Sequence, residues 1–269
     1  MKPSSYVLSW LDDNEAVFAS IADQIWQLAE PAWEERESSE IQIKYLQSIG
    51  FTIERNIASI PTAFMAEWGE GKPVLGFVGE YDALPGLSQK AVSIPDPAIV
   101  GGPGHGCGHN LLGTGGMASA AALRWWLEEH GTTGAVRYFG CPAEEQISAK
   151  PFMARTGCFT DLDAAFNFHP ANINMPGKGT AVGVNDLSFR FFGTTAHAGA
   201  APEKGRSALD AVELMNVGVN YLREHVPDKV RIHYAVTNGG RVPNIVPDEA
   251  EVWYFVRALE RDLLDEVTD

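Results

Sequence analysis

The segment GPGHGCGHNLLGTGG, residues 102–116, places two histidines and a cysteine among glycines, directly before a long apolar segment. Apolar residues recur at helical spacing from about Leu111 to His130, so we predict a long helix there. The runs PVLGFVGEY (73–81) and AVRYFGC (135–141) are rich in β-branched and aromatic residues and are predicted as strands. A strand, a helix and another strand in this order are typical of a parallel sheet covered by helices. This stretch therefore predicts an α/β fold.

Similar patterns on both sides extend this α/β domain. Helical spacing recurs at residues 12–30 and 35–49, and the second segment closes at Gly50, as a helix C-terminus commonly does. The remaining predicted elements are strands at 51–57, 62–68 and 163–169 and a short helix at 149–156. We expect a mostly parallel sheet that helices cover on both faces.

The pattern changes after MPGKGT, residues 175–180, where we place a domain boundary near Gly177 to Thr180. This divides the chain into a first domain, 1–178, and a second domain, 179–269. The second domain is predicted to contain, in order, a strand at 181–193, a helix at 205–225, strands at 229–240 and 249–258, and a helix that begins at 259. This β-α-β-β-α order indicates a split βαβ sandwich of α+β class, incomplete at its C-terminus.

Composition limits the possible functions. The 269 residues are 45% hydrophobic and 20% charged, which is enough apolar residue for a full core. A formal net charge of −15 without a basic cluster argues against nucleic acid and anionic membranes as partners. Residues 1–15 lack the apolar region of a signal peptide, and no segment approaches the length of a membrane span. Three cysteines, an odd number without framework spacing, fit a reducing compartment, and we expect a cytoplasmic protein.

Side chains that can bind metal follow the predicted strands, at the edge where open α/β sheets bind ligands. They are Asp82, the group His105, Cys107 and His109, the pair Glu144 and Glu145, and His169. Taken singly, each has an ordinary explanation as a turn former, a solvated side chain or, for Cys107, a small buried side chain. Taken together, a thiolate, imidazoles and carboxylates at successive strand ends favour a site for Zn²⁺ or Mn²⁺.

The adjacent carboxylates Glu144 and Glu145 suit a division of roles, in which one binds metal and the other moves protons. Two like charges held close together also raise the pKa of one of them, which favours a general base near neutral pH. A solvated acidic pair on the surface is the alternative.

The glycine-rich segment also permits a phosphate cradle, since Gly113, Gly115 and Gly116 fall near a predicted helix start. This alternative is weak, because the lysine and hydroxyl residues of a phosphate-binding loop do not follow. Cys107 and His109, two residues apart, can instead turn toward one ion, and Asn110 is expected to cap the helix.

Six motifs in order make the chain resemble the M20 family of metallopeptidases and amidohydrolases, most closely its aminobenzoyl-glutamate-hydrolysing branch. They are GEYDALPGL (79–87), GHGCGHNLLGTGG (104–116), CPAEE (141–145), FNFHP (166–170), GTTAHAGAAPEKGRSALDAVELM (193–215) and RVPNIVPDEAEVWYFVR (241–257). The resemblance implies an α/β catalytic domain with an inserted lid domain that forms a homodimer. It also implies hydrolysis of an amide bond to an amino acid, in a small substrate with a free carboxylate: aminobenzoyl-glutamate, an N-acyl amino acid or a dipeptide.

The resemblance further assigns roles to single residues. It implies two divalent ions, Zn²⁺ or Mn²⁺, that activate a water, with Glu144 as general base and Asp82 orienting a ligand. The implied metal ligands are Cys107, His109, Glu145 and His169. In the lid, the resemblance implies that His197 reaches the substrate in the partner's site and stabilises the oxyanion, and that Asn244 contacts substrate.

Two departures from the family pattern leave other functions open. Glu80 stands where many members have a histidine before DALP, so it is not assigned as a ligand. The resemblance also implies a segment beyond residue 269 that completes the lid and supplies a further metal-binding histidine. A truncated or split chain that binds metal or dimerises without catalysis is therefore an alternative, and a closed structural metal site is a weaker one.

Overall fold

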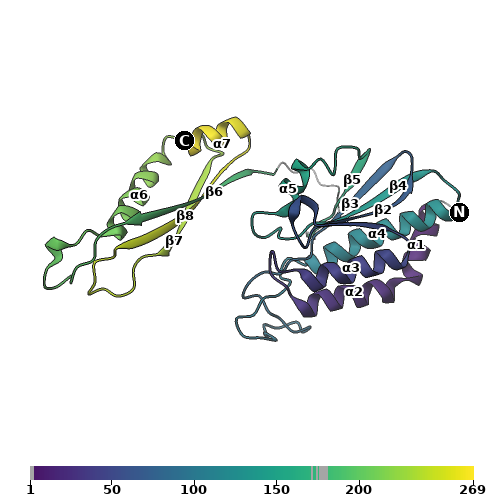
Figure 1. Cartoon of the computed structure of the whole chain (residues 1–269), viewed down its shortest axis with the longest axis horizontal. Helices are drawn as coiled ribbons and strands as arrows, with labels where there is room; N and C mark the ends of the chain where they lie inside the picture. The colour runs from purple at the N-terminus through teal and green to yellow at the C-terminus, as the bar shows by residue number, and fades with distance from the viewer. Residues whose placement is uncertain (1–2, 171, 174, 176–180) are drawn as a thin grey trace. The chain divides into compact units, whose positions relative to one another are not determined.

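The computed structural model describes residues 3–170, 172–173, 175 and 181–269, and it divides into two compact units, Met1–Asn174 and Met175–Asp269 (Figure 1). The predicted boundary at Gly177 to Thr180 lies outside the described residues. The two units are described separately.

The helices of the first unit differ from the predicted ones mainly at the N-terminus. They are α1 (Pro3–Asp13), α2 (Glu15–Leu28), α3 (Arg36–Ser48), α4 (His109–Glu129) and α5 (Ala149–Arg155), with a short 3₁₀ turn, η1, at Ile57–Ser59. The predictions of α2, α3, α4 and α5 are confirmed to within a few residues at each end, whereas α1 was not predicted. It is stabilised by packing against α4, where Trp10 stacks on Trp125 with ring centroids 5.8 Å apart.

The sheet of the first unit is mixed. Its strands are β1 (Thr52–Arg55), β2 (Phe64–Glu70), β3 (Val74–Gly79), β4 (Gly134–Gly140) and β5 (Ala164–Phe166), in the order β1-β2-β4-β3-β5. The prediction of an α/β domain is confirmed, and its parallel part is β4-β3-β5. At the other edge, β1 pairs antiparallel with β2, and β2 with β4. The segment between β1 and β2 is too short for a parallel crossover, which takes about a dozen residues or more.

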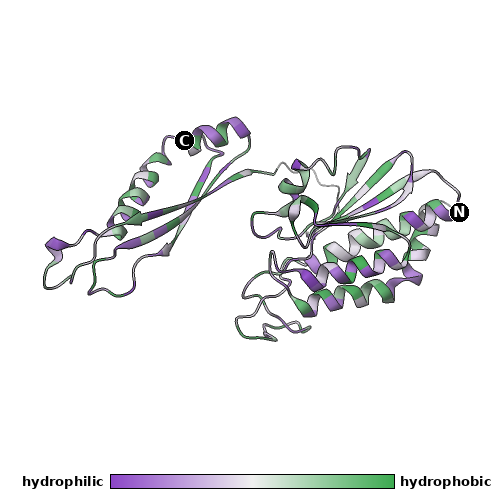
Figure 2. Cartoon of the chain, in the orientation of Figure 1, coloured by the Kyte–Doolittle hydropathy of each residue, from purple (hydrophilic) through white to green (hydrophobic). Residues whose placement is uncertain are grey.

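Strand alternation sends neighbouring residues of β4 into two different cores. Tyr138 joins a large cluster with α2, α3 and α4, whereas Phe139 joins a smaller one with Met153 of α5 on the opposite face. Helices α1 to α4 lie together against one face of the sheet, with their apolar sides turned inward (Figures 1 and 2). Ile25 and Leu46 are fully buried there, and each such side chain stabilises the fold by about 1.5–3 kcal/mol.

The start of α4 differs from its predicted form. The residue that caps it is Gly108, whose φ of 79° lies in the left-handed region that glycine adopts readily. Asn110 lies inside the helix and its Nδ2 donates to the carbonyl of Ala22 at 3.3 Å, so the prediction that it caps α4 is wrong.

The phosphate-cradle alternative is also contradicted, because Gly113, Gly115 and Gly116 lie within α4 rather than at its start. A Cβ on Gly113 would stand 2.6 Å from the carbonyl oxygen of Glu80. Glycine here allows the helix to pack closely against the segment that follows β3.

The second unit is a three-stranded antiparallel sheet with helices packed on one side. Its elements are β6 (Gly183–Phe192), η2 (Pro202–Lys204), α6 (Ala208–Leu222), β7 (Arg231–Asn238), β8 (Glu249–Ala258) and α7 (Arg261–Thr268), with strand order β6-β8-β7. Val212 and Val252 are fully buried between α6 and the sheet. The predicted β-α-β-β-α order is confirmed. In neither unit does the described chain contain a helix long and apolar enough to cross a membrane.

Candidate metal centre

His109, the first residue of α4, lies at the centre of the candidate site. Its side chain is fully buried, and its Nδ1 donates to Asp82 Oδ1 at 2.8 Å. Asp82 follows β3, so a strand end and a helix start together fix the orientation of the ring. A carboxylate bound to one ring nitrogen is the usual arrangement behind a metal-binding histidine. It leaves Nε2 free to face the cluster.

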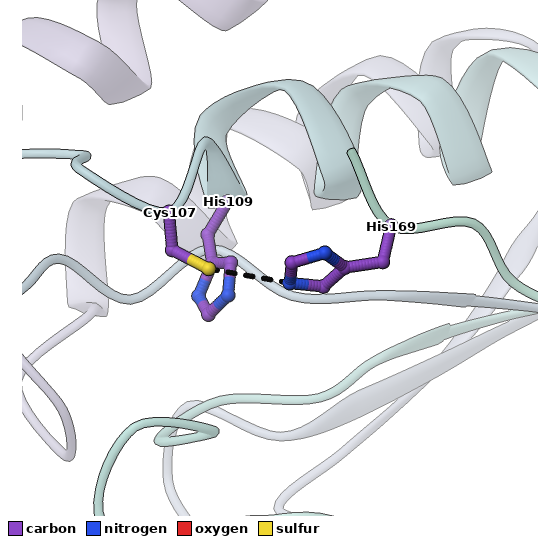
Figure 3. Close-up of side chains that lie close together, drawn as sticks. All are labelled: Cys107, His109 and His169. Atoms are coloured by element: carbon purple, nitrogen blue, oxygen red, sulfur yellow. Dashed lines mark hydrogen bonds between the residues drawn. The ribbon is translucent and has the colours of Figure 1, made fainter. Parts of the chain in front are cut away.

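Cys107 and His169 approach this ring from different segments. Cys107 lies two residues before α4, and His169 follows β5. Figure 3 shows the imidazole of His169 pointing toward the Cys107 sulfur, and the Sγ to Nε2 distance is 3.2 Å. The ligand atoms of Cys107, His109 and His169 all lie within 4.8 Å of one another.

Three carboxylates complete the cluster around His109 Nε2. The nearest oxygens of Glu80, Glu145 and Glu144 lie 3.4, 3.8 and 3.9 Å from it. Within the described residues, His109 Nε2 and Glu145 Oε1 are buried and have no hydrogen-bond partner. Buried polar atoms are rarely left unpaired, because each loses its hydration without compensation. A divalent cation between these two atoms would satisfy both, so the residues present fit a metal ion.

The acidic surroundings shift the pKa values of the cluster. Burial, followed by the charge of Glu145, raises the pKa of the Cys107 thiol to about 11. Burial, followed by the charge of Glu80, also raises the pKa of Glu144. For His109, burial lowers the pKa, but the hydrogen bond to Asp82 and the nearby acidic charges outweigh it and raise the pKa overall. The centre therefore favours bound protons, which a cation would replace.

Asp82 also connects to the loop that carries the glutamate pair. Its Oδ2 accepts the backbone N–H of Glu145 at 2.9 Å. Burial raises the pKa of Asp82, but the hydrogen bonds from His109 and Glu145 outweigh this effect and lower the pKa overall. Asp82 is therefore a carboxylate anion that joins the start of α4 to the loop after β4.

Glu80 and Lys150 form a pair that the sequence analysis did not predict. Lys150 of α5 makes an ion pair with Glu80 Oε1, while Glu80 Oε2 faces His109. Glu80, His109 and Glu144 form a second group of potential ligand atoms within 4.8 Å. The position of Glu80 after a strand was a usable signal, but no sequence pattern marked Lys150.

His105 takes a different role from its neighbours. The sequence pattern grouped it with Cys107 and His109, but its Nε2 donates to the carbonyl of Ile25 in α2 at 3.1 Å. It lies in neither group of potential ligand atoms. The ring anchors the glycine-rich loop to the helix layer.

His197 and Asn244 lie in the second unit, where two loops run side by side. Both side chains are exposed. The Ala198 N–H donates to the carbonyl of Asn244 at 3.0 Å, and the Gly199 N–H donates to His197 Nδ1 at 3.2 Å. The structure therefore brings together the two predicted lid residues, and it places the other six site residues in the first unit.

The fold and the site define a class: an α/β domain with a thiol, imidazoles and carboxylates gathered at the carboxyl ends of its parallel strands. The model of peptidase family M20/M25/M40 matches residues 76–267. The chain belongs to this family, which confirms the resemblance seen in the sequence.

Similar proteins include one of the subunits of p-aminobenzoyl-glutamate hydrolase from Escherichia coli, which is 49% identical over 94% of this chain and 53% of its own length. An aminobenzoyl-glutamate utilization protein from Klebsiella pneumoniae has the same fold, with a TM-score of 0.69 and 17% identity over 100% of this chain and 72% of its own. A dinuclear metal-binding peptidase of the M20 family from Bacillus subtilis also matches, with a TM-score of 0.61 and 21% identity over 94% of this chain and 68% of its own. The chain spans about half the length of the curated relatives it matches.

Proposed function

We propose that this protein is a metal-dependent hydrolase of an amide bond to an amino acid, with aminobenzoyl-glutamate, an N-acyl amino acid or a dipeptide as substrate. The observation that carries the proposal is the pair of buried, unpartnered atoms His109 Nε2 and Glu145 Oε1, 3.8 Å apart within the described part of the chain. The 49% identity to the p-aminobenzoyl-glutamate hydrolase of Escherichia coli supports the substrate class.

In this proposal Cys107, His109, Glu145 and His169 hold divalent ions, two in number and either Zn²⁺ or Mn²⁺. Thiolate, imidazole and carboxylate together suit these borderline ions. When bound, the ions supply Lewis acidity toward a water and toward the substrate carbonyl. Asp82 keeps the His109 ring in the tautomer whose Nε2 carries the lone pair.

Glu144 is the proposed general base. Its side chain is 38% exposed and lies beside the cluster, 3.9 Å from His109 Nε2, so it can reach a solvent water. Its carboxylate takes one proton from the water whose oxygen attacks the carbonyl carbon. It then gives that proton to the amine nitrogen as the C–N bond breaks. The raised pKa of Glu144, from burial and the charge of Glu80, favours holding the proton between the two steps.

In the same proposal, residues 1–178 form the catalytic domain and residues 179–269 form a lid that makes a homodimer. His197 of the lid stabilises the oxyanion of the partner's site, and Asn244 contacts substrate. Exposed apolar side chains on α6 support the dimer, because Leu214, Val217 and Tyr221 recur at helical spacing and are 73%, 49% and 72% exposed.

The test is hydrolysis of p-aminobenzoyl-glutamate, followed by release of p-aminobenzoate from protein loaded with Zn²⁺ or Mn²⁺. We expect activity that chelation removes and added metal restores. Metal uptake without hydrolysis of this substrate, of N-acyl amino acids or of dipeptides would contradict the proposal. That result would favour the alternative of a chain that binds metal or dimerises without catalysis.

A further inference from the structure

A second buried carboxylate, Glu35, lies under the loop that carries Glu144 and Glu145. It precedes α3 and is 0% exposed. Its Oε1 accepts the backbone N–H groups of Ala143, at 2.7 Å, and of Trp33, at 3.0 Å. Its Oε2 accepts the Thr62 hydroxyl at 3.2 Å. These contacts join three segments that are far apart in the sequence.

Glu35 and Asp82 hold this loop at alternate residues. Glu35 accepts the N–H of Ala143, and Asp82 accepts the N–H of Glu145 at 2.9 Å. Glu144 lies between the two anchored peptide groups. Its direction and that of Glu145 are therefore set by two buried carboxylates on either side.

The anchored loop has a backbone that would not hold this form by itself. Ala143, Ile147 and Ser148 have φ values of 56°, 70° and 58°. Non-glycine residues rarely adopt this left-handed region, and they persist there only where surrounding contacts enforce it. The hydrogen bond from Ala143 to Glu35 is such a contact.

A buried carboxylate is an expensive way to accept hydrogen bonds, because it loses its hydration. The partners of Glu35 within the described residues are uncharged N–H and O–H groups. Burial is the main reason that its pKa rises to about 7, and the charge of Asp82 adds to the rise. The contacts of Glu35 are thus directed at the loop rather than at an ion pair.

We propose that Glu35 is a positioning residue of the metal centre, whose acceptor oxygen fixes the peptide of Ala143 and so aims Glu144 and Glu145 at His109. The proposal rests on the roles proposed above for Glu144 and Glu145. It assigns Glu35 no contact with substrate or metal.

The test compares three substitutions at this position. Glu35→Gln keeps an acceptor oxygen for the Ala143 N–H and gives Thr62 a donor. Glu35→Asp keeps the charge but is one methylene too short, and Glu35→Ala removes both charge and acceptor. The matched control is Leu46→Ala, which opens a cavity in the helix-facing core of the same unit, away from the loop.

Two readouts need no catalytic activity: amide hydrogen exchange of the peptide spanning residues 142–148, and Zn²⁺ affinity by competition with a chelating dye. We expect Glu35→Ala and Glu35→Asp to exchange this peptide at least about 10-fold faster. We expect their Zn²⁺ affinity to fall about 10- to 100-fold, the range for residues that support metal ligands. Glu35→Gln should stay within about threefold of the wild type in both readouts, because it preserves the acceptor.

The control and the catalytic readout separate positioning from general stability. Leu46→Ala should lower the melting temperature and leave loop exchange and Zn²⁺ affinity unchanged. The proposal is overturned if Glu35→Ala matches Leu46→Ala in both readouts, or if Glu35→Gln is as impaired as Glu35→Ala. Should Glu35→Ala not fold, the comparison of Glu35→Asp with Glu35→Gln decides.

Failure of the proposed function gives a different result. A wild-type protein that binds Zn²⁺ but hydrolyses no amide contradicts the enzymatic proposal, while the exchange and affinity data still test Glu35. In an active protein, we expect Glu35→Ala to lower kcat about 10- to 100-fold and to leave KM within about twofold, since a misdirected base affects the chemical step.

Discussion

Asp82 accepts a 2.8 Å hydrogen bond from His109 Nδ1, and both side chains are shielded from solvent. The bond fixes the tautomer of His109, so its Nε2 is available as a ligand. Asp82→Asn can present an amide N–H to Nδ1, which would move the ring proton to Nε2. We expect Zn²⁺ affinity to fall about 10- to 100-fold in this variant, measured by competition with a chelating dye. Affinity equal to the wild type would show that Asp82 does not support the ligand.

Substitution of Glu144 separates proton transfer from metal binding. Glu144→Gln removes the base and leaves the proposed ligands in place, so we expect turnover to fall about 10²- to 10⁴-fold with metal content unchanged. Hydrolysis assays and elemental analysis on the same sample check both parts. Loss of metal together with activity would make Glu144 a ligand instead.

The fold and the site were predictable from the sequence to different extents. The order β3-α4-β4 followed from periodicity, because long buried segments carry a strong apolar pattern. Helix α1 was missed because packing of Trp10 on Trp125 stabilises it, and local sequence does not report such contacts. The antiparallel edge of β1 and β2 depends on the short segment between them, whose significance appears only when the pairing is known.

At the site, residue types after strand ends were informative, but hydrogen-bond partners were not. Cys107, His109 and His169 meet as the strand-end argument predicted, because parallel strands bring their carboxyl ends to one edge. His105 has the same residue type, yet it bonds to Ile25 of α2. Glu35 was not considered, because its contact with Ala143 joins residues 108 positions apart.

Metal binding by Cys107 should release a proton. Burial and the charge of Glu145 raise the pKa of its thiol to about 11, so the metal-free protein carries the proton at neutral pH. A metal ligand must be the thiolate, and binding therefore displaces that proton. We expect Cys107→Ser to bind Zn²⁺ more weakly and to release about one proton fewer per ion, measured by calorimetry in buffers of different ionisation enthalpy. Equal proton release in both proteins would place Cys107 outside the ligand set.

The stability of the metal-free protein should depend on pH through Glu35. Burial raises its pKa from 4.5 to about 7 in the folded chain, so the folded state binds this proton more tightly than the unfolded state. The resulting stabilisation is fully present below pH 4.5 and is lost as the pH rises through 7. Relative to Glu35→Gln, the wild type should lose on the order of 3 kcal/mol of unfolding free energy across this range. Urea unfolding at a series of pH values checks this, and parallel curves for the two proteins would contradict it.

X-ray absorption at the zinc edge tests the metal centre most directly. In the zinc-loaded protein we predict sulfur at about 2.3 Å together with nitrogen or oxygen at about 2.0–2.1 Å. In Cys107→Ser the sulfur contribution should disappear while the nitrogen and oxygen contribution remains. A zinc environment without sulfur in the wild type, or one that keeps its sulfur in Cys107→Ser, would contradict the proposed centre.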